Sequence, residues 1–312
     1  MDIKIGVLNI NGYFENSKDL KNELFSTSDC ELLCLTETKL LGDNNINVRE
    51  YGYVFVGHNR REVHRLAPTG SGGVGLLVKE DLLEDFNVEI LDKSYDGILA
   101  ISIKHKITDY TVNIFIVYLP PERSVHGRDG AAFFNQLIYL TYLHCEYDKF
   151  LILGDFNARI GLKPDVDPEL DNVPTRKPNV DSVCNQHGDE LLDFLLETKM
   201  CILNGRTNSE FDNDFTFCHT RGKSVVDYII VPHDQVSEYS DLTITPCNDI
   251  IQKYDLVSLC HSANSPPDHS LLTVKTCFSF KNMIANDQYE YNEYASCNMD
   301  TNLRSRYRIK SI

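Results

Sequence analysis

The sequence lacks the features that would place the protein in or across a membrane. Its 312 residues contain no apolar run of about 18 residues, the length that a membrane-spanning helix needs. The N-terminus, MDIKIGVLNI, has no basic segment ahead of a longer apolar core, so it does not have the pattern of a secretory signal peptide. We therefore expect an intracellular protein, nuclear or cytoplasmic, with no membrane partner.

Closely spaced cysteine pairs are absent as well. The chain has ten cysteines, but none forms a C-x-x-C pair, and several stand inside apolar runs, such as Cys34 in ELLCLTE and Cys201 in KMCILNG. Zinc sites and disulfide frameworks both depend on more regular spacing. The sequence thus predicts reduced, buried cysteines, as in most intracellular proteins.

The sequence has fewer positively than negatively charged residues. The 30 lysines and arginines are outnumbered by 46 aspartates and glutamates, which gives a formal net charge of −16. Proteins that bind nucleic acid usually carry a basic surface. A metal-dependent enzyme can still cleave DNA, because a bound cation neutralises part of the local field and a basic groove can lie on an acidic body. We expect weak non-specific DNA binding.

Many short apolar runs are present, with few helical stretches between them. Strand-like runs begin with IKIGVLNI at residues 3–10 and end with HSLLTVKT at residues 269–276, and 42% of the chain is hydrophobic. Residues 1–280 are therefore expected to form one α/β domain, a four-layer sandwich of two packed sheets, mostly antiparallel or mixed, flanked by helices. Residues 281–312 turn polar and are interpreted as a tail or linker.

Polar residues recur just beyond the ends of these runs. Asn9 follows IKIGVL, Glu37 follows ELLCLT, and Asp268 with His269 precedes SLLTV. Taken alone, each could be a turn residue. GDFN is more specific, because Asp155 and Asn157 on either side of a buried Phe156 put two polar groups on one face of a strand end.

The ordered motifs LNINGYF, TETKL, GSGGVGLLV, IVYLPP, GDFNARIG, SVVDYIIV and SPPDHSLL carry a family resemblance. Over about residues 3–275 the chain resembles the endonuclease/exonuclease/phosphatase superfamily. Within it, the chain is most similar to the apurinic-endonuclease branch and to the endonuclease domains of LINE-type (non-LTR) retrotransposons. The N-x-x-G-x-x-L-L-x-F stretch that starts at Asn185 belongs to that resemblance.

The resemblance implies a catalytic set, which is Asn9, Glu37, Tyr118, Asp155, Asn157, Asp227 and His269. Glu37, with Asn9 and Asp268, would hold Mg²⁺, and Mn²⁺ is the alternative ion. Asp155 would orient or deprotonate the attacking water, and Asp227 would pair with His269. Tyr118, Asn157 and Thr216 would contact the substrate.

A basic segment, with His58, Arg60, Arg61, His64 and Arg65, precedes GSGGVG. It is compatible with an ordinary solvated loop and with a loop that binds DNA phosphates. On the second interpretation Arg60, Arg61 and Arg65, with Lys39, are the expected DNA contacts.

Three functions remain open at this point. The first is a DNA endonuclease that nicks one strand, with DNA as the partner and a past fusion to a reverse transcriptase. The second keeps the phosphodiester chemistry but acts on lipid or inositol phosphates. The third is a catalytically dead retroelement fragment, although every expected catalytic position is filled. None of them requires an obligate protein partner.

Overall fold

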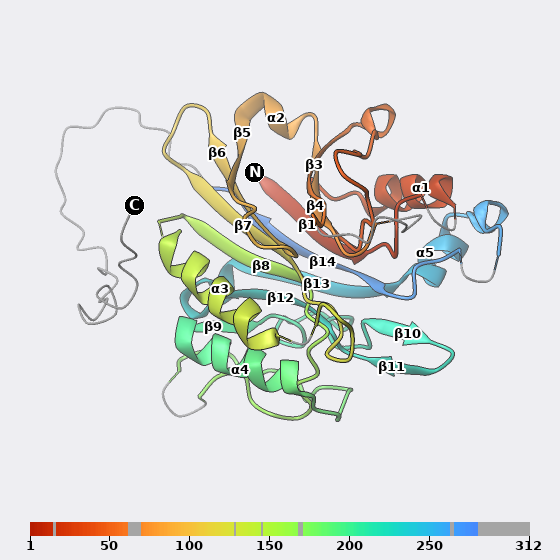
Figure 1. Ribbon diagram of the computed structural model, residues 1–312. Coiled ribbons are helices and arrows are strands. Elements are labelled where there is room, and N and C mark those ends of the chain that lie inside the picture. Colours follow the sequence, from red (N-terminus) through yellow and green to blue (C-terminus); the bar gives the residue numbers. More distant parts are fainter. Residues whose placement is uncertain are drawn as a thin grey trace. The chain divides into compact units, whose positions relative to one another are not determined.

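Two six-stranded β-sheets form the centre of the protein (Figure 1). The computed structural model describes residues 1–279 apart from 15–16, 62–69, 128, 145, 168–170 and 263–264. Residues Met1–Phe280 group into one unit by their contacts. The tail or linker expected at residues 281–312 lies outside the described residues.

The first sheet has the strand order β13-β14-β1-β2-β4-β3. Its strands are β1 (Asp2–Asn9), β2 (Leu32–Thr36), β3 (Tyr53–His58), β4 (Val74–Lys79), β13 (Tyr239–Pro246) and β14 (Ser270–Cys277). Strand β1 is parallel to β2 and antiparallel to β14, so the first and last strands of the fold are neighbours.

The second sheet has the order β5-β6-β7-β8-β12-β9. Its strands are β5 (Phe86–Asp92), β6 (Ile98–His105), β7 (Thr111–Tyr118), β8 (Lys149–Asp155), β9 (Met200–Ile202) and β12 (Asp227–Pro232). Strands β7 and β8 are parallel, whereas β8 and β12 are antiparallel with Asp227 opposite Asp155. Both sheets are therefore mixed, as the sequence predicted.

The alternation of side chains along the strands explains the layers. In β7, Ile114 and Ile116 point into the core between the two sheets, whereas Phe115 and Val117 face the helices α3 (Gly130–Leu143) and α4 (Gln186–Thr198). A strand covered on both faces is apolar at nearly every position, and this produced the continuous runs in the sequence.

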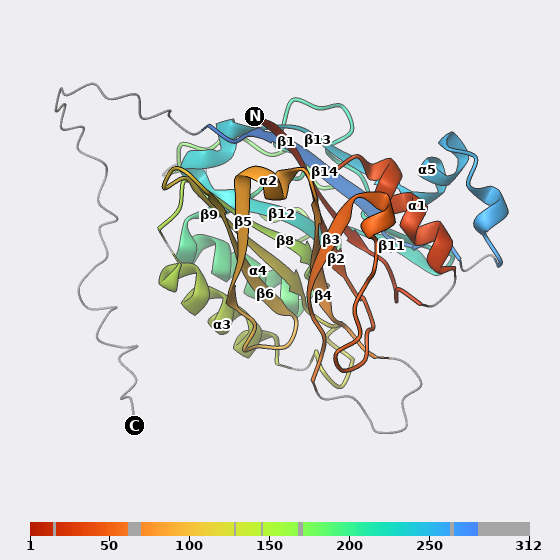
Figure 2. The same cartoon turned by 90° about the horizontal axis from the view of Figure 1, so that it is seen from above.

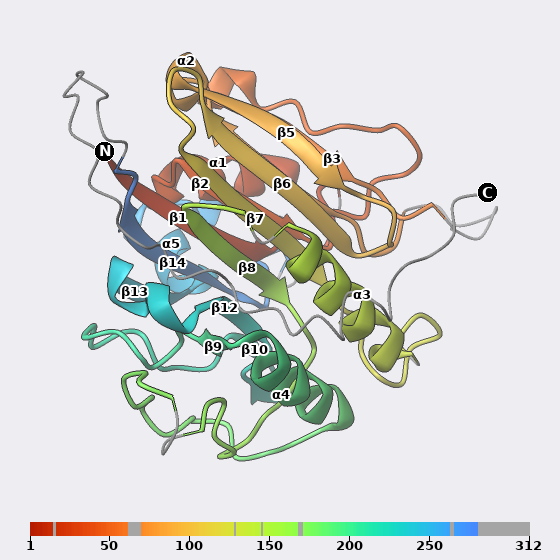
Figure 3. The same ribbon diagram turned by 90° about the vertical axis from the view of Figure 1, so that its left-hand side faces the viewer.

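Helices cover the outer face of each sheet. Helices α1 (Lys18–Ser28) and α5 (Cys247–Lys253) pack on the first sheet through Leu24, Phe25 and Ile250. Helices α3 (Gly130–Leu143) and α4 (Gln186–Thr198) lie on the opposite side of the protein (Figure 2). Figure 3 shows α3 beside the face of the second sheet. The short helices are α2 (Leu82–Asp85), η1 (Arg49–Tyr51), η2 (His233–Glu238) and η3 (Val257–Leu259). The four-layer α/β sandwich is confirmed.

A two-stranded hairpin, β10 (Phe217–His219) and β11 (Gly222–Ser224), stands apart from both sheets (Figure 1). In the segment before α4, two buried aspartates form ion pairs that anchor the chain to the body. Asp165 is buried and pairs with Arg206, and buried Asp181 accepts two hydrogen bonds from Arg159.

No helix in the described part of the chain is long and apolar enough to cross a membrane. The cysteines that the structure describes are free thiols, and Cys30, Cys34, Cys201 and Cys247 are buried, whereas Cys184 and Cys277 are exposed.

The end of the folded domain is testable by truncation. Phe278 is fully buried, its ring centroid lies 5.8 Å from those of Phe86, edge-on, and Tyr110, tilted, and its N–H donates to the Met1 carbonyl. A chain that ends at residue 280 should keep the melting temperature of the full chain within about 2 °C, since it keeps every buried side chain of the described residues. A chain that ends at residue 277 should lose about 3 kcal/mol, because a buried aromatic ring leaves the core. Calorimetry of the two truncated chains measures both melting temperatures. Equal values would place the domain end before Phe278.

Candidate active site

One rim of the two sheets collects the polar residues that the sequence singled out. Asn9, Tyr118 and Asp155 are the last residues of β1, β7 and β8, Asp227 is the first of β12, and His269 directly precedes β14. A pocket of about 240 Å³ opens at this rim, and we call it the catalytic pocket. It is lined by Asn9, Asn11, Glu37, Pro121, Asp155, Asn157, Phe217, Ser224, Val226, Asp268 and His269.

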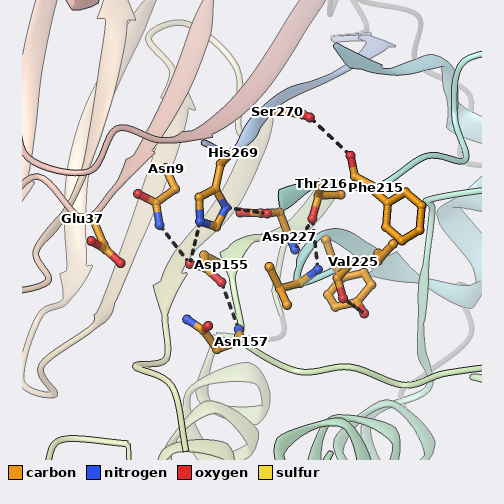
Figure 4. A network of polar contacts seen from close by, with 12 residues as sticks. Asn9, Glu37, Asp155, Asn157, Phe215, Thr216, Val225, Asp227, His269 and Ser270 are labelled. Carbon is orange, nitrogen blue, oxygen red and sulfur yellow. Dashed lines mark hydrogen bonds and ion pairs between the residues drawn. The ribbon is translucent and has the colours of Figure 1, made fainter. Parts of the chain in front are cut away.

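His269 and Asp227 form the hydrogen bond expected from the sequence. His269 Nδ1 lies 2.8 Å from Asp227 Oδ2, and His269 Nε2 lies 3.9 Å from Asp155 Oδ2 (Figure 4). Both side chains are buried. Burial opposes the imidazolium, but the charge and hydrogen bond of Asp227 outweigh it and raise the His269 pKa to about 10. The proton on Nδ1 points to Asp227, so Nε2–H is left available at the catalytic pocket.

Asp155 is held by two hydrogen bonds at the base of the pocket. Asn9 Nδ2 donates to its Oδ2 at 2.9 Å, and the Asn157 backbone N–H donates to its Oδ1 at 3.0 Å (Figure 4). Burial raises the Asp155 pKa above its ordinary value, and the negative charge of Asp227 raises it further. A carboxylate with a raised pKa is a stronger base, which suits proton removal from water.

Glu37 lies on the other side of Asn9 and is held by Tyr118, whose hydroxyl donates to Glu37 Oε1 at 2.7 Å. Lys39 Nζ is 3.4 Å from Glu37 Oε2 and also donates to Asn11 Oδ1. Burial, followed by the charge of Glu37, raises the Tyr118 pKa, so the phenol stays protonated as a donor. Glu37, Lys39 and Asn11 all have left-handed backbone conformations, with φ near 50°. Such conformations are uncommon outside glycine and tend to gather at functional sites.

The residues expected to hold a metal ion supply a suitable set of donors. Asn9, Glu37 and Asp268 line one pocket with oxygen atoms, which are the ligands Mg²⁺ prefers. Asp155, Asp227 and His269 also have ligand atoms within 4.8 Å of one another. In that second group, however, Asp227 Oδ2 and His269 Nδ1 already satisfy each other. In the first group, Asn9 Oδ1 accepts from the Asn11 N–H and Glu37 Oε1 accepts from the Tyr118 hydroxyl, so the ion site at Asn9, Glu37 and Asp268 stays a prediction.

Thr216 does not have the position that substrate contact would require. Its side chain is fully buried, and its Oγ1 accepts hydrogen bonds from the backbone N–H groups of Val226 and Asp227, both at 3.0 Å. It fixes the start of β12, and through it Asp227, and it does not line the catalytic pocket.

Among the described residues of the basic segment, two are buried and one is exposed. His58 is buried with Nδ1 at 3.2 Å from the Ile98 carbonyl, and burial lowers its pKa. Arg60 is buried beside Tyr118 and donates to Ser71 Oγ, whereas Arg61 is exposed and donates to the Lys93 carbonyl. His64 and Arg65 lie outside the described residues.

Sequence reasoning missed the β10–β11 hairpin. The Phe217 ring packs edge-on against the His269 ring at 5.0 Å, so the hairpin forms one wall of the catalytic pocket. A second pocket of about 500 Å³, the hairpin pocket, adjoins it, and its charged or titratable lining residues are Arg159, His219, Arg221, Lys223 and Asp268. The signal was present in FCHTRGKS, where basic residues alternate across a glycine-containing turn between two strand-like segments.

A model described as the Endonuclease/Exonuclease/phosphatase family matches residues 6–258. The match ends before Asp268 and His269, so the placement of these two residues rests on the geometry above. No curated protein sequence matches the chain.

Several solved structures share the fold. The 3′ phosphatase NExo from Neisseria, solved with a product DNA hairpin, is 18% identical with a TM-score of 0.56, covering 89% of this chain and 100% of that one. The endonuclease domain of TRAS1, a telomere-specific non-LTR retrotransposon, is 13% identical with a TM-score of 0.55, covering 89% and 99%. The AP endonuclease LMAP from Leishmania major is 13% identical with a TM-score of 0.60, covering 88% and 87%.

The Asp227–His269 pair makes a pH-dependent prediction. Because the folded His269 pKa is raised from 6.5 to about 10, the pair's stabilisation is complete below about pH 6.5 and is lost as the pH rises through about 10. Asp227→Asn should lower the His269 pKa, and its loss of stability should be largest near and below neutral pH and shrink toward pH 10. Histidine NMR titration and urea unfolding at several pH values measure both. A His269 that titrates like free imidazole in both proteins would contradict the assignment.

Proposed function

Because the chain belongs to the endonuclease/exonuclease/phosphatase family, we propose that it is a Mg²⁺-dependent endonuclease that hydrolyses phosphodiester bonds within DNA. The family takes its name from nucleases and phosphatases, and the structural neighbours are described as a 3′ phosphatase and as endonucleases. The choice of Mg²⁺, with Mn²⁺ as a substitute, rests on the oxygen donors of Asn9, Glu37 and Asp268. When bound, the ion would neutralise charge on the phosphoryl oxygen and on the leaving alkoxide.

The chain's own residues carry out proton transfer and stabilise the developing negative charge. Asp155 takes the proton of the attacking water, the phosphorus–oxygen bond to the leaving alkoxide breaks, and that alkoxide takes up a proton from solvent. His269, kept protonated by Asp227, directs Nε2–H at a non-bridging oxygen. Asn157 adds a donor beside the same phosphate, and Tyr118 donates its hydroxyl proton to Glu37 and so fixes that carboxylate at the pocket.

Basic pockets on both sides of the catalytic pocket support internal cleavage of a long polyanion. At the catalytic rim the first sheet runs from β14 through β1, β2 and β4 to β3. The hairpin pocket lies at the β14 side. A third pocket of about 410 Å³, the β3-edge pocket, lies beyond the opposite strand, and its charged or titratable lining residues are Asp43, His58, Arg60, Arg61 and Lys93.

This arrangement is the observation that carries the proposal. A protein with a formal charge of −16 has local positive charge on each side of its reactive group. A DNA strand that occupies both basic pockets continues past the scissile phosphate in both directions. Cleavage inside a long strand requires this arrangement. A small lipid or inositol phosphate would use neither pocket fully. Nicking in the manner of a retrotransposon endonuclease belongs to the same proposal, supported by the shared fold of the TRAS1 domain.

Catalytic substitutions test the chemistry. Asp155→Ala and His269→Ala should each lower turnover by at least about a hundredfold, which is the scale of acid–base and charge-stabilising contributions. Glu37→Ala should chiefly raise the Mg²⁺ concentration needed for half-maximal activity. Covalently closed circular DNA is the substrate, because it has no ends and only an endonuclease can cut it. Near-normal nicking by Asp155→Ala would remove Asp155 from the mechanism.

Charge neutralisation tests the two basic pockets. Arg221→Ser with Lys223→Ser, and separately Arg61→Ser with Lys93→Ser, should each weaken duplex binding and flatten the slope of log affinity against log salt by about 2. Hydrolysis of bis(4-nitrophenyl) phosphate should be unaffected, because that ester reaches neither pocket.

The matched control is Lys104→Ser with Lys275→Ser. These two exposed lysines lie toward the opposite ends of β6 and β14 from the catalytic rim, so this variant changes the net charge equally but should leave the salt slope unchanged. If only the hairpin variant affected binding, and linear DNA were processed from its ends while circles stayed intact, the enzyme would be end-directed like the 3′ phosphatase NExo.

A further inference from the structure

The asparagine of the N-x-x-G stretch, Asn185, lies between helix α4 and the turn that carries Asp155 and Asn157. It is the N-cap residue of α4, and its Oδ1 accepts from the Gly188 N–H at 2.9 Å, which is the usual role of asparagine at a helix start. A cap alone would explain its presence. Its other contacts, however, reach away from the helix.

Three further hydrogen bonds join Asn185 to the residues that follow GDF. Asn185 Oδ1 also accepts from the Arg159 N–H at 2.7 Å, and the Asn185 N–H donates to the Arg159 carbonyl at 3.0 Å. Asn185 Nδ2 donates to the Asn157 carbonyl at 2.9 Å. One side chain therefore caps the helix and fixes two backbone groups of the catalytic turn at once.

Gly188 shows how closely the turn and helix approach each other. A Cβ atom added there would lie 2.0 Å from the Arg159 carbonyl oxygen, so only glycine fits at this position of α4. The spacing of Asn185 and Gly188 thus follows from one physical requirement, the seating of residues 157–159 against the first turn of α4.

The turn needs such support, because Asn157 has a left-handed backbone with φ of 45°. Its N–H donates to Asp155 Oδ1, and its side chain donates to the Leu119 carbonyl. If the Asn157 peptide rotated, Asp155 would lose one of its two donors and the Asn157 side chain would leave the pocket. Conformations of this kind persist only where the surroundings hold them.

We propose that Asn185 is a positioning residue of the active site, which holds the Asn157 peptide so that Asp155 and Asn157 face the scissile phosphate. This proposal rests on the proposed phosphodiesterase function. It assigns a specific task to the Asn185 amide group, beyond capping α4.

The roles of the Asn185 side-chain oxygen and side-chain nitrogen can be tested separately. Asn185→Asp keeps an oxygen acceptor for the Gly188 and Arg159 N–H groups, and aspartate is an equally good helix cap. It removes the donor to the Asn157 carbonyl and places an oxygen there instead. The matched control is Asp129→Ala, which removes the cap of α3, where Asp129 accepts from the Ala132 N–H and does not line the catalytic pocket.

In nicking of closed circular DNA, Asn185→Asp should lower kcat roughly ten- to a hundredfold with little change in KM, as expected for misplaced catalytic groups. Asp129→Ala should lower the melting temperature more than Asn185→Asp does, yet keep kcat. In a protein that carries Asn157→Gly, which tolerates the left-handed backbone and lacks the side chain, adding Asn185→Asp should cost clearly less than it does in the wild type. Fully additive losses, or an unchanged kcat in Asn185→Asp, would overturn the proposal.

A second readout does not depend on activity. By NMR, Asn185→Asp should shift the Asn157 and Arg159 backbone amides and speed hydrogen exchange of the Asn157 N–H, and Asp129→Ala should do neither. Amides of residues 155–159 that are unchanged in Asn185→Asp would overturn the proposal even if the wild-type protein cut no DNA. Inactivity of the wild type together with the expected amide changes would instead refute the proposed function alone.

Discussion

The burial of Asp155, Asp227 and His269 between the ends of two sheets is the constraint on which the site depends. Two carboxylates and an imidazole are removed from water, with contacts of 2.8 and 3.9 Å through His269. Buried charge is costly unless it is paired and hydrogen-bonded, so each group has fixed partners. The partners follow from strand register, because Asp227 stands opposite Asp155 in the β8–β12 pair. A slip of one residue would turn Asp227 to the other face of the sheet.

The turns around this cluster are held as firmly as the strands. The loop after β1 and the loop after β2 are joined by backbone hydrogen bonds from Gly12 to Glu37 and from Tyr13 to Thr38. The buried Lys21 side chain, from α1, donates to the Gly12 carbonyl of the same loop. The neighbouring elements therefore fix the backbone of these loops, and the backbone in turn orients the side chains of the pocket. Charge stabilisation in a transition state requires such preorganisation.

The layers and the catalytic rim could be predicted from the sequence because both depend on patterns of apolar and polar residues within short segments. FLILG is apolar throughout since β8 is covered on two faces, and the polar residues after it mark the catalytic rim. The task of Thr216 could not be predicted, because it depends on backbone donors ten and eleven residues away that only the fold brings near. The burial of Arg60 could not be predicted either, because Ser71 and Tyr118, which lie against it, are brought there by the fold. The hairpin was missed because its residues signal a turn without showing which cavity the turn borders.

The pairing of β1 with β14 has a consequence for how the enzyme is made. The residues that meet at the rim come from almost the whole length of the chain, from Asn9 in the first strand to His269 before the last. Strand β14 is not an edge strand that could be added to a finished sheet, since it lies between β13 and β1. A ribosome-bound chain can therefore complete neither the first sheet nor the pair of His269 with Asp227 until residues 270–277 have left the exit tunnel. A product of premature termination before β14 therefore lacks both the completed first sheet and the strand that follows His269.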